Sequence, residues 1–252
     1  MADKILEERS QFVVKANDII RKARFNMTLT QQKVYLYLIS KIKPEDNGNT
    51  PYVFRIGDFL KVCDLDQSGA NYQYIRDSIL EISKVRFWIE GEKKTMLRGL
   101  LDKVDINHGE GTIECYFHDD VKPYLMYLRD NYTQFELKNV LNLRSKYSVR
   151  LYELMKSYQH VRYVQITLEQ LRDGISAEGY TAYKDFKKRL LTPAINEVNA
   201  LTDINITYTE SRTGHKVTSF QFHITPKTSE EIWLAEKERE RTHGKNTETD
   251  RG

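Results

Sequence analysis

The residues best suited to chemistry in this sequence are lysines at helical spacing in the run YKDFKKRLLTPAINEVN, between Tyr183 and Asn199. In a helix, Lys184, Lys187 and Lys188 would share one side, because residues three and four apart lie on the same face, while Phe186 would point elsewhere. Ammonium groups arranged in this way attract negatively charged partners such as phosphate. The alternative is an amphipathic surface helix whose lysines are only solvated.

The sequence offers little for catalysis or metal binding. The six histidines never occur as H-x-H or H-E-x-x-H, and there is no G-x-x-x-x-G-K-[S/T] loop for nucleotide phosphates. The cluster HDD at residues 118–120 also fits a strand end followed by a polar turn. Cys63 and Cys115 are far apart and outside any C-x-x-C spacing. We therefore expect no catalytic residue, no metal and no cofactor, in a protein that is not an enzyme.

Length and composition predict a globular protein. The 252 residues suit one large or two ordinary domains, and 40% hydrophobic residues are enough for packed cores. The net charge is only +3, so affinity for a polyanion must come from local clusters of Lys and Arg. The charged N-terminal residues contain no apolar run long enough for a signal peptide or membrane span. We expect a cytoplasmic protein without a membrane partner.

An internal repeat is visible in short segments that recur in one order. VYLYLISK, which begins at Val34, matches VRLYELMK, which begins at Val149. The sequence YVFRIGDFL (52–60) is then echoed by YVQITLEQL (163–171), and each reads as a short strand that leads into a helix. A further helix follows in each half, in YIRDSILEIS and DFKKRLLTPAINEV. The recurrence of several segments in the same order favours a tandem duplication.

Each half ends in strands joined by a glycine-bearing turn. In the first half we expect the strand VRFWIE (85–90) and a strand ending at His118, and in the second half INITYTE (204–210) and a strand ending at His223. Helix, short strand, two helices and a β-hairpin make a winged-helix domain, whose helix-turn-helix inserts its second helix into the DNA major groove. The predicted fold class is α+β, a tandem pair of winged-helix domains related by internal duplication.

The predicted domains follow from this repeat. Residues 1–132 form the N-terminal winged-helix domain, 133–227 the C-terminal one, and 228–252 a charged, flexible tail that begins with a short helix. Ser145 or Ser148 is expected to cap the first helix of the second half.

Candidate DNA contacts lie at the two predicted recognition helices. Pro193 lacks a backbone donor, so we expect a kink or a new helix capped by Thr192, which leaves the front of the run to face DNA. The predicted contacts in the second half are Thr181, Tyr183, Lys184, Lys187, Lys188 and Arg189. Those in the first half are Asn71, Tyr72, Gln73 and Arg76, where Asn and Gln suit adenine but also suit a polar helix start.

Further basic residues occur where a hairpin or a helix start would meet phosphate. They are Arg144, Lys146 and Arg150 at the opening of the second half, Arg212, His215 and Lys216 in its hairpin turn, and Lys93, Lys94 and Arg98 near the first hairpin. Each alone is better explained as a solvated surface charge. Their sum matters more, because each neutralised phosphate steepens the salt dependence of binding.

Three segments together resemble a known family. They are MTLTQQKVYLYLISKI from Met27, RSKYSVRLYELMKSYQ from Arg144 and FKKRLLTPAINEVNALTDINITY from Phe186. They are similar to the iteron-binding replication initiators of theta-type plasmids, whereas residues 91–111 carry no such resemblance. The resemblance implies a protein that binds direct repeats at the origin, opens the adjacent duplex and recruits the host replication initiator and the replicative helicase. It also implies a monomer in equilibrium with a homodimer, formed through the first domain, that can repress its own gene.

Three alternatives remain open at this point. A winged-helix transcription regulator would prefer a single inverted site, and a rolling-circle nickase would use a tyrosine, although its usual histidine pair is missing. A third possibility is that the basic helix serves a protein partner. If the initiator prediction is right, two recognition helices in one chain should reach successive major grooves, about 10 bp apart.

Overall fold

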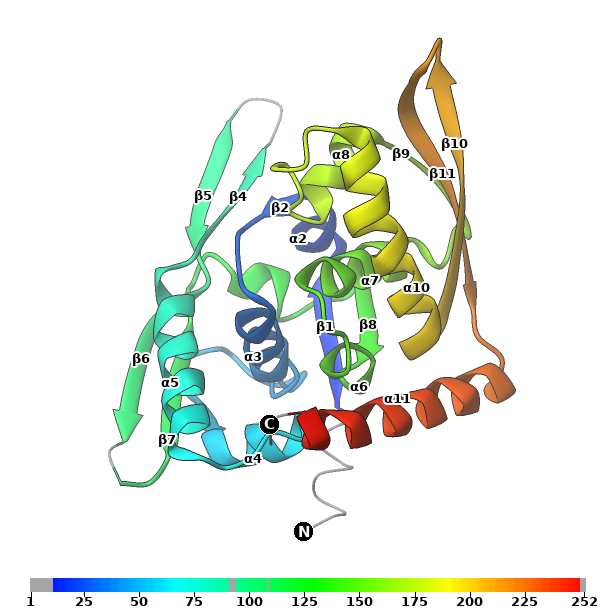
Figure 1. The fold of residues 1–252 in the computed structure, drawn as a ribbon. Helices are drawn as coiled ribbons and strands as arrows, with labels where there is room; N and C mark the ends of the chain where they lie inside the picture. Colours follow the sequence, from blue (N-terminus) through cyan, green and yellow to red (C-terminus); the bar gives the residue numbers. More distant parts are fainter. Residues whose placement is uncertain (1–10, 91–93, 108, 250–252) are drawn as a thin grey trace. The chain divides into compact units, whose positions relative to one another are not determined.

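The computed structural model of the chain describes residues 11–90, 94–107 and 109–249, with side chains described except at Glu90 and from residue 242 onward. Its contacts divide the chain into two compact units, unit 1 (Met1–Leu141) and unit 2 (Asn142–Gly252) (Figure 1). The domain boundary that we predicted after residue 132 falls inside strand β8 (Tyr132–Glu136), which pairs along its whole length with β1 (Phe12–Ala16). We therefore place the end of the first domain after Leu141.

Unit 1 mixes short helices with antiparallel strands. Its helices are α2 (Asn17–Lys22), α3 (Leu29–Ile39), α4 (Ile56–Val62), α5 (Gly69–Lys84), the 3-10 turn η1 (Lys122–Tyr124) and α6 (Lys138–Leu141). In addition to β1 and β8, its strands are β2 (Ala23–Arg24), β3 (Tyr52–Arg55), β4 (Arg86–Glu90), β5 (Thr95–Gly99), β6 (Leu101–Asn107) and β7 (Thr112–Phe117).

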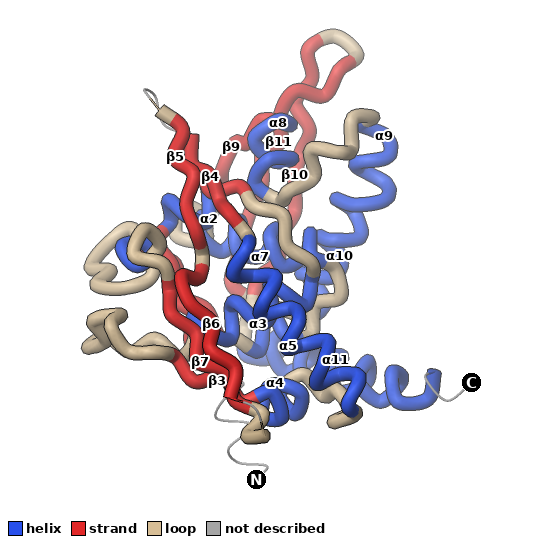
Figure 2. The backbone as a smooth tube through the Cα atoms, turned by 90° about the vertical axis from the view of Figure 1, so that its left-hand side faces the viewer, coloured by secondary structure: helices blue, strands red, loops and turns tan. Residues whose placement is uncertain are grey.

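The core of unit 1 forms where α3 meets the sheet of order β3-β7-β6. Helix α3 begins with a capping box, in which Thr28 accepts from the Gln31 backbone and the Gln31 side chain accepts from the Thr28 backbone. Tyr37 on α3, Phe54 on β3 and Phe59 on α4 pack together with ring centroids 5.2 to 5.3 Å apart. This cluster fixes the strand and helix that precede α5, and Figure 2 shows α5 running alongside the same sheet.

Our prediction of the first hairpin is wrong in its strand pairing. The strand that contains VRFWIE, β4, pairs with β2 and β5 rather than with β7, and β7 pairs instead with β6 and β3. The β4–β5 hairpin is therefore an insertion between α5 and the hairpin β6–β7. Strand β4 reads as an alternating strand in sequence, but alternation specifies only which face is buried, as at Phe87 and Ile89, and not which neighbour it pairs with.

Unit 2 repeats this layout with longer hairpin strands. Its helices are α7 (Lys146–Tyr158), α8 (Leu168–Gly174), α9 (Tyr183–Asp185), the π-helical segment η2 (Phe186–Leu191), α10 (Thr192–Leu201) and α11 (Ser229–Thr249). Its strands are β9 (Tyr163–Thr167), β10 (Ile204–Thr213) and β11 (Lys216–Pro226).

The two units share one sheet topology. In unit 2 the order is β10-β11-β9, so the short strand pairs with the last strand of the hairpin, as β3 pairs with β7 in unit 1. Phe220 on β11 lies opposite Ile166, as Ile113 on β7 lies opposite Phe54. The predicted order of helix, short strand, two helices and hairpin is thus present in both units.

Thr192 does not cap a new helix in front of Pro193, which was one of the two outcomes that we predicted. Residues 186–191 widen into a π-helical turn, and α10 continues from Thr192 without a side-chain cap. Proline lacks the backbone N–H of a regular helix, and its ring crowds the carbonyl four residues before it. A wider turn in front of the proline accommodates both effects, so the lysines of η2 and the apolar residues of α10 stay on one continuous helical path.

The charged C-terminal segment begins with helix α11. Thr228 and Glu231 form a reciprocal cap at its start, with the Glu231 carboxylate accepting from the Thr228 backbone at 2.8 Å. Ala235 on α11 is buried, and α11 contacts α10. Whether the rest of the segment is flexible stays a prediction. Among the described residues, no helix is both long and apolar enough to cross a membrane.

Candidate nucleic-acid interface

The front of the second-unit helix presents basic side chains to solvent and apolar ones to the core. Phe186 and Leu190 are buried, whereas Lys184 and Lys188 are exposed on the opposite side. An open hollow of about 440 Å³ runs along this exposed side and is lined by Tyr183, Lys184, Lys187, Lys188 and Thr192. The helical spacing read from the sequence thus produces the expected amphipathic element.

A single carboxylate joins this helix to the hairpin. Glu210 on β10 accepts hydrogen bonds from the Tyr183 hydroxyl, from Lys187 Nζ at 2.6 Å and from Arg212 Nη2 at 2.8 Å. The Glu210 side chain is 12% exposed, while that of Lys187 is 43% exposed. The carboxylate therefore holds two predicted DNA contacts from the helix and one from the hairpin in a fixed arrangement.

The hydrogen bonds to Glu210 shift the pKa values of the groups in this cluster. Burial alone raises the pKa of Glu210, but the hydrogen bonds from Lys187, Tyr183 and Arg212 outweigh it and lower the pKa to about 2. Burial and the bond to Glu210 raise the pKa of Tyr183, and the same carboxylate raises the pKa of Lys187. At neutral pH the carboxylate is ionised, the lysine is charged and the phenol donates.

Our sequence reasoning missed Glu210, although the sequence contains a signal for it. Ile204, Ile206, Tyr208 and Glu210 alternate along one strand, and the first two are fully buried. Glu210 is the next residue of this inward-facing row, and its carboxylate needs hydrogen-bond donors because an unpaired buried charge is costly. The alternation therefore indicates a partnered glutamate, while only the fold identifies its partners.

An asparagine fixes the helix against the hairpin from the other end. Asn199 on α10 donates to the Ile206 carbonyl at 2.9 Å and accepts from the Ile206 backbone N–H at 2.7 Å. Its side-chain amide thus pairs with the backbone N–H and C=O of Ile206, as the backbone of a neighbouring strand would. The α9–η2–α10 helix is thus held to the hairpin by Glu210 near its front and by Asn199 near its end.

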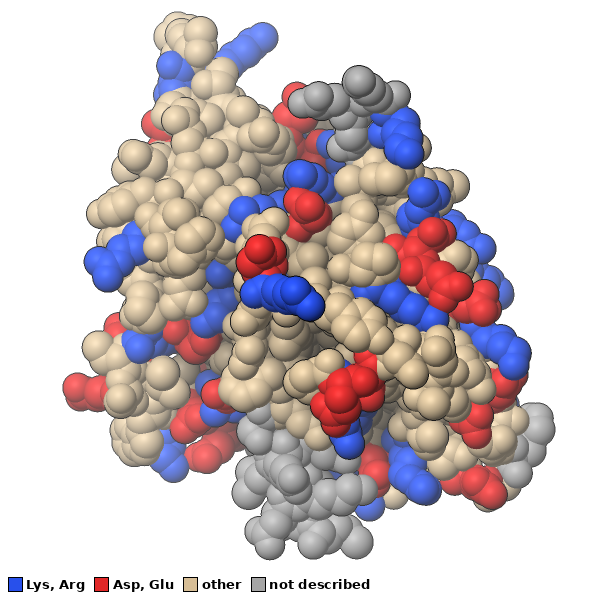
Figure 3. Space-filling model, turned by 180° about the vertical axis from the view of Figure 1, so that it is seen from behind, with Lys and Arg blue, Asp and Glu red and all other residues tan. Residues whose placement is uncertain are grey.

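The β10–β11 hairpin ends in a basic tip. Arg212, His215 and Lys216 are exposed around Gly214, whose φ of +59° suits the tight turn. Figure 3, which views the molecule from behind Figure 1, shows Lys and Arg side chains at this tip and both signs of charge over the face below it. The tip has the position and charge expected of a wing that meets a phosphate backbone.

The equivalent helix of unit 1, α5, is less free to meet a phosphate. Gln73 donates to both carboxylate oxygens of Asp77, at 3.0 and 3.3 Å, and Arg76 donates to the same group at 3.1 and 3.2 Å. Asn71 lies in the first turn, where its backbone meets the Ser68 cap and its side chain donates to the Asp66 carbonyl. The polar helix start that we kept as an alternative is therefore present.

Tyr72 lies where α5 approaches the β6–β7 hairpin. A cavity of about 200 Å³ there is lined by Tyr72, Gln73 and Arg76 from the helix and by residues of the hairpin. A Cβ added at Gly57 would come within 2.5 Å of the Tyr72 hydroxyl, so the absence of a side chain at Gly57 leaves room for this ring. Tyr72 and the two polar residues thus line a small groove between helix and hairpin.

Two of the three basic residues at the opening of unit 2 are accessible, and one is not. Arg144 is exposed and Lys146 is half-buried, with its Nζ 5.2 Å from the centre of the Tyr147 ring. Arg150 is only 1% exposed, pairs with Glu153 at 3.2 Å and donates to the Gly174 carbonyl at 3.0 Å. Our prediction that Arg150 contacts DNA conflicts with this burial, because its guanidinium faces the core of unit 2.

The remaining candidates lie at the margins of these elements. Thr181 is exposed, and its carbonyl accepts from Arg172 at 3.0 Å, while Arg189 pairs with Asp185 at 3.3 Å. Arg98 on β5 pairs with Asp120 at 3.4 Å. Lys94 is exposed in the turn of the inserted hairpin, and Lys93 lies outside the described residues.

The titratable side chains of the described residues are not arranged for metal-dependent chemistry. Within the described ranges, no group of three or more His, Cys, Asp and Glu side chains is arranged to hold a metal ion. In the HDD cluster, His118 Nδ1 accepts from the Asp120 backbone at 3.2 Å and lies 3.4 Å from the Asp120 carboxylate. This geometry fits the turn after a strand that we kept as its explanation.

Comparison with known families decides what these units belong to. The family described as Initiator Replication protein, WH1, matches residues 12–156, and Initiator Rep protein, WH2, matches residues 167–224. The chain belongs to this initiator replication protein family. The resemblance read from the sequence is confirmed, as is the α+β fold of two winged-helix domains.

Solved structures share this fold, and one further protein is similar in sequence. The Pi initiator protein, crystallised in complex with iteron DNA, is similar with a TM-score of 0.71 and 19% identity over 88% of this chain and 99% of that one. Domains 2 and 3 of RctB give a TM-score of 0.50 and 14% identity over 80% and 85% of the chains. An uncharacterized 27.6 kDa protein of Escherichia coli is 20% identical over 241 residues, which cover 89% of this initiator and 98% of that protein.

Proposed function

We propose that this protein is a plasmid replication initiator that binds directly repeated sequences, iterons, in double-stranded origin DNA. The observation that carries the proposal is membership of the initiator family over both halves of the chain. The similar fold of the Pi initiator, crystallised with iteron DNA, supports it, as does the basic helix beside a basic hairpin tip in unit 2.

Unit 2 supplies most of the affinity in this proposal. The α9–η2 helix enters a major groove, where Lys184, Lys187 and Lys188 meet phosphates or base edges, and Arg212 and Lys216 contact the backbone from the hairpin tip. Unit 1 inserts α5 into the next major groove, about 10 bp away. Each bound chain then covers about two helical turns, and the summed phosphate contacts make binding strongly dependent on salt.

The later steps rest on the family resemblance. We infer that the bound monomer opens the adjacent AT-rich duplex and recruits the host replication initiator and the replicative helicase. Homodimers formed through unit 1 are in equilibrium with the monomers and repress the gene of the initiator. The protein acts in these steps by binding and deforming DNA, without catalysing a reaction itself.

A nuclease footprint on the DNA that flanks the coding sequence tests the proposal. We expect regularly phased protections of about two helical turns each, which weaken as salt rises. The control is the same DNA with the protected repeats scrambled. A lone inverted site that survives as the only protection would favour a transcription regulator, and the absence of any sequence-dependent protection would overturn the DNA-binding function.

A further inference from the structure

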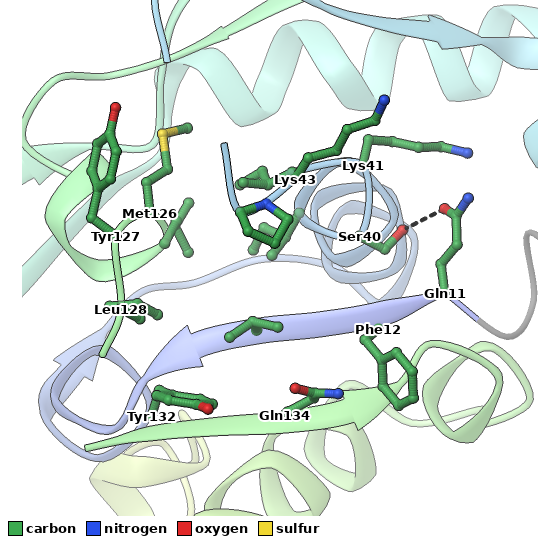
Figure 4. A pocket seen from close by; sticks show the side chains of 15 residues that line it. Gln11, Phe12, Ser40, Lys41, Lys43, Met126, Tyr127, Leu128, Tyr132 and Gln134 are labelled. Atoms are coloured by element: carbon green, nitrogen blue, oxygen red, sulfur yellow. Dashed lines mark hydrogen bonds between the residues drawn. The ribbon is translucent and has the colours of Figure 1, made fainter. Parts of the chain in front are cut away.

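A second site lies in unit 1, outside the elements proposed to contact DNA. A groove of about 620 Å³ opens over one face of the β1–β8 pair. Figure 4 looks into it: Phe12 comes from β1, Tyr132 and Gln134 come from β8, and Lys41 and Lys43 follow the end of α3. The volume is in the range of ligand pockets, about 300 to 1,000 Å³.

The groove is lined by aromatic rings that face solvent. Phe12 is 49% exposed, Tyr132 is 42% exposed and Tyr127, at one end of the groove, is 65% exposed. Tyr127 also has a φ of +57°, a conformation that bulky side chains rarely adopt and that the surrounding structure must enforce. Exposed aromatic side chains gathered in one concave patch are typical of a recognition surface.

The floor of the groove is held in place by hydrogen bonds around the buried Asn17. The Asn17 backbone donates to the Asn131 carbonyl at 2.8 Å, the Asn17 amide donates to Asn131 Oδ1 at 3.0 Å, and Thr133 donates to Asn17 Oδ1 at 2.5 Å. These bonds fix both neighbours of Tyr132 in the chain. A partner that binds here meets a preformed face, so little conformational entropy is lost on the side of the groove.

The charge of the lining is of one sign. Two lysines, Lys41 and Lys43, line the groove, and none of the lining residues that the structure describes is Asp or Glu. Lys41 Nζ lies 4.2 Å from the centre of the Tyr37 ring, which anchors it at the rim. An apolar, aromatic groove with a positive rim is complementary to apolar side chains accompanied by carboxylates.

We propose that this groove binds a short peptide segment of a partner protein in which bulky apolar side chains alternate with acidic ones. The apolar side chains lie on Phe12 and Tyr132, and the carboxylates meet Lys41 and Lys43. The groove is open rather than enclosed, so it admits a chain that continues at both ends. Its lining residues lie on elements other than α5, α9, η2 and the two hairpins β6–β7 and β10–β11, so the site does not depend on the proposed function.

An unbiased peptide selection tests this site. Random heptapeptides displayed on phage are selected against the immobilised full-length protein, with counter-selection against Tyr132→Ser. We expect the enriched peptides to carry Asp or Glu beside Phe, Leu, Ile or Trp. The best peptide, fluorescently labelled, should bind about tenfold more weakly to Lys43→Glu and to Tyr132→Ser. The first substitution reverses a positive charge at the rim, and the second removes an aromatic side chain from the groove.

The control variant is Leu97→Ser, on β5 of the same unit, where Leu97 is 60% exposed but lies outside the groove. It should bind the peptide as the wild type does, and all three variants should keep the DNA footprint. Selection that enriches no peptide, or only basic or polar ones, would overturn the proposal. It would also be overturned if the protein self-associates in sedimentation, Tyr132→Ser abolishes that association and no peptide competes, since a second copy would then be the occupant.

Discussion

The two helices that hold equivalent positions in units 1 and 2 differ in where their acidic partner comes from. In α5 of unit 1, Arg76 is paired with Asp77 on the same helix. In α9–η2 of unit 2, Lys187 is paired with Glu210 on the hairpin. Within the described part of the chain, no ion pair or hydrogen bond occupies the ammonium of Lys184 in the same helix.

This difference shows that equivalent helices of a repeated fold can differ in charge pairing while the sheet topology stays the same. A partner on the same helix, as at Asp77, lowers the positive charge of the surface that would face DNA. A partner on the hairpin, as at Glu210, instead ties the helix to the hairpin. The two units therefore differ in how the charges of their equivalent helices are paired.

A second difference lies in the first helices of the two repeats. At the repeat offset of 115 residues, Arg150 and Glu153 of unit 2 correspond to Tyr35 and Leu38 of unit 1, and all four are buried. The same face of the helix is therefore buried in both units, although its side chains form an ion pair in unit 2 and are mainly apolar in unit 1. A buried ion pair is often no more stabilising than an apolar pair of similar size, but breaking it leaves a buried charge.

The largest expected effect is on the stability of unit 2. Arg150→Ala should lower its free energy of unfolding by about 3 to 5 kcal/mol, because Glu153 stays buried without its partner. The double variant Arg150→Tyr with Glu153→Leu, which copies unit 1, should recover most of that loss. Urea unfolding followed by fluorescence checks both. If Arg150→Ala is as stable as the wild type but weakens DNA binding, Arg150 belongs to the interface after all.

Glu210→Gln should destabilise unit 2 by a smaller amount. The pKa of Glu210 falls from an ordinary 4.5 to about 2, which corresponds to an order of 3 kcal/mol of stabilisation. Since the folded-state pKa is lowered, this stabilisation is complete above about pH 4.5 and is lost as pH falls toward 2. Unfolding of both proteins at pH 7 and pH 3 should show a difference that shrinks at the lower pH. A difference independent of pH would mean that the carboxylate charge is not what stabilises the contact.

Substitutions in the basic helix should reduce DNA affinity, and Lys187→Ala should also lower the stability of unit 2 because it removes a hydrogen bond to Glu210. Lys184→Ala and Lys187→Ala should each weaken binding, by about 1 to 3 kcal/mol where the side chain reaches a base. One of them should also lose discrimination between the specific repeat and a scrambled one. Titration of labelled duplexes at several salt concentrations measures both effects, with Lys237→Ala on α11 as the matched control. Unchanged affinity for both variants would remove this helix as the recognition element.

The smallest expected effect comes from the acidic partner in unit 1. Asp77→Asn frees Arg76 and Gln73 from an ionised carboxylate and removes a negative charge from α5. Affinity for duplex DNA should rise slightly, by about 0.5 kcal/mol, because exposed ion pairs contribute little. The same titrations should show a slightly steeper salt dependence. Weaker binding would instead indicate that Asp77 positions Arg76 for its contact.

Much of the fold could be predicted from local sequence. The short strands and the helices that follow them, at residues 52–62 and 163–174, match the predicted segments. Ser145 caps α7, as one of the two serines proposed, with its side chain accepting from the Tyr147 backbone. These features depend on periodicity and capping, which act between residues close in sequence.

Strand pairing and partner choice could not be predicted in the same way. The sequence predicted a strand at β4 and none at β6, and only the packing of unit 1 decides that β6 joins β7. Likewise, Arg150 looks the same in sequence as Arg144, but Arg150 lies on a buried face of α7, whereas Arg144 is exposed and precedes that helix. Both choices depend on contacts between residues distant in the chain.

The sequence by itself determined the repeat, the winged-helix layout, the family and the basic face of the α9–η2 helix. The tertiary structure decided which charges remain available: it buried Arg150, tied Lys187 and Arg212 to Glu210, and opened the groove over β1 and β8. The physical reason is that periodicity specifies the face on which a side chain lies. Its burial, its charge partner and its access to DNA depend on what the rest of the chain packs against that face.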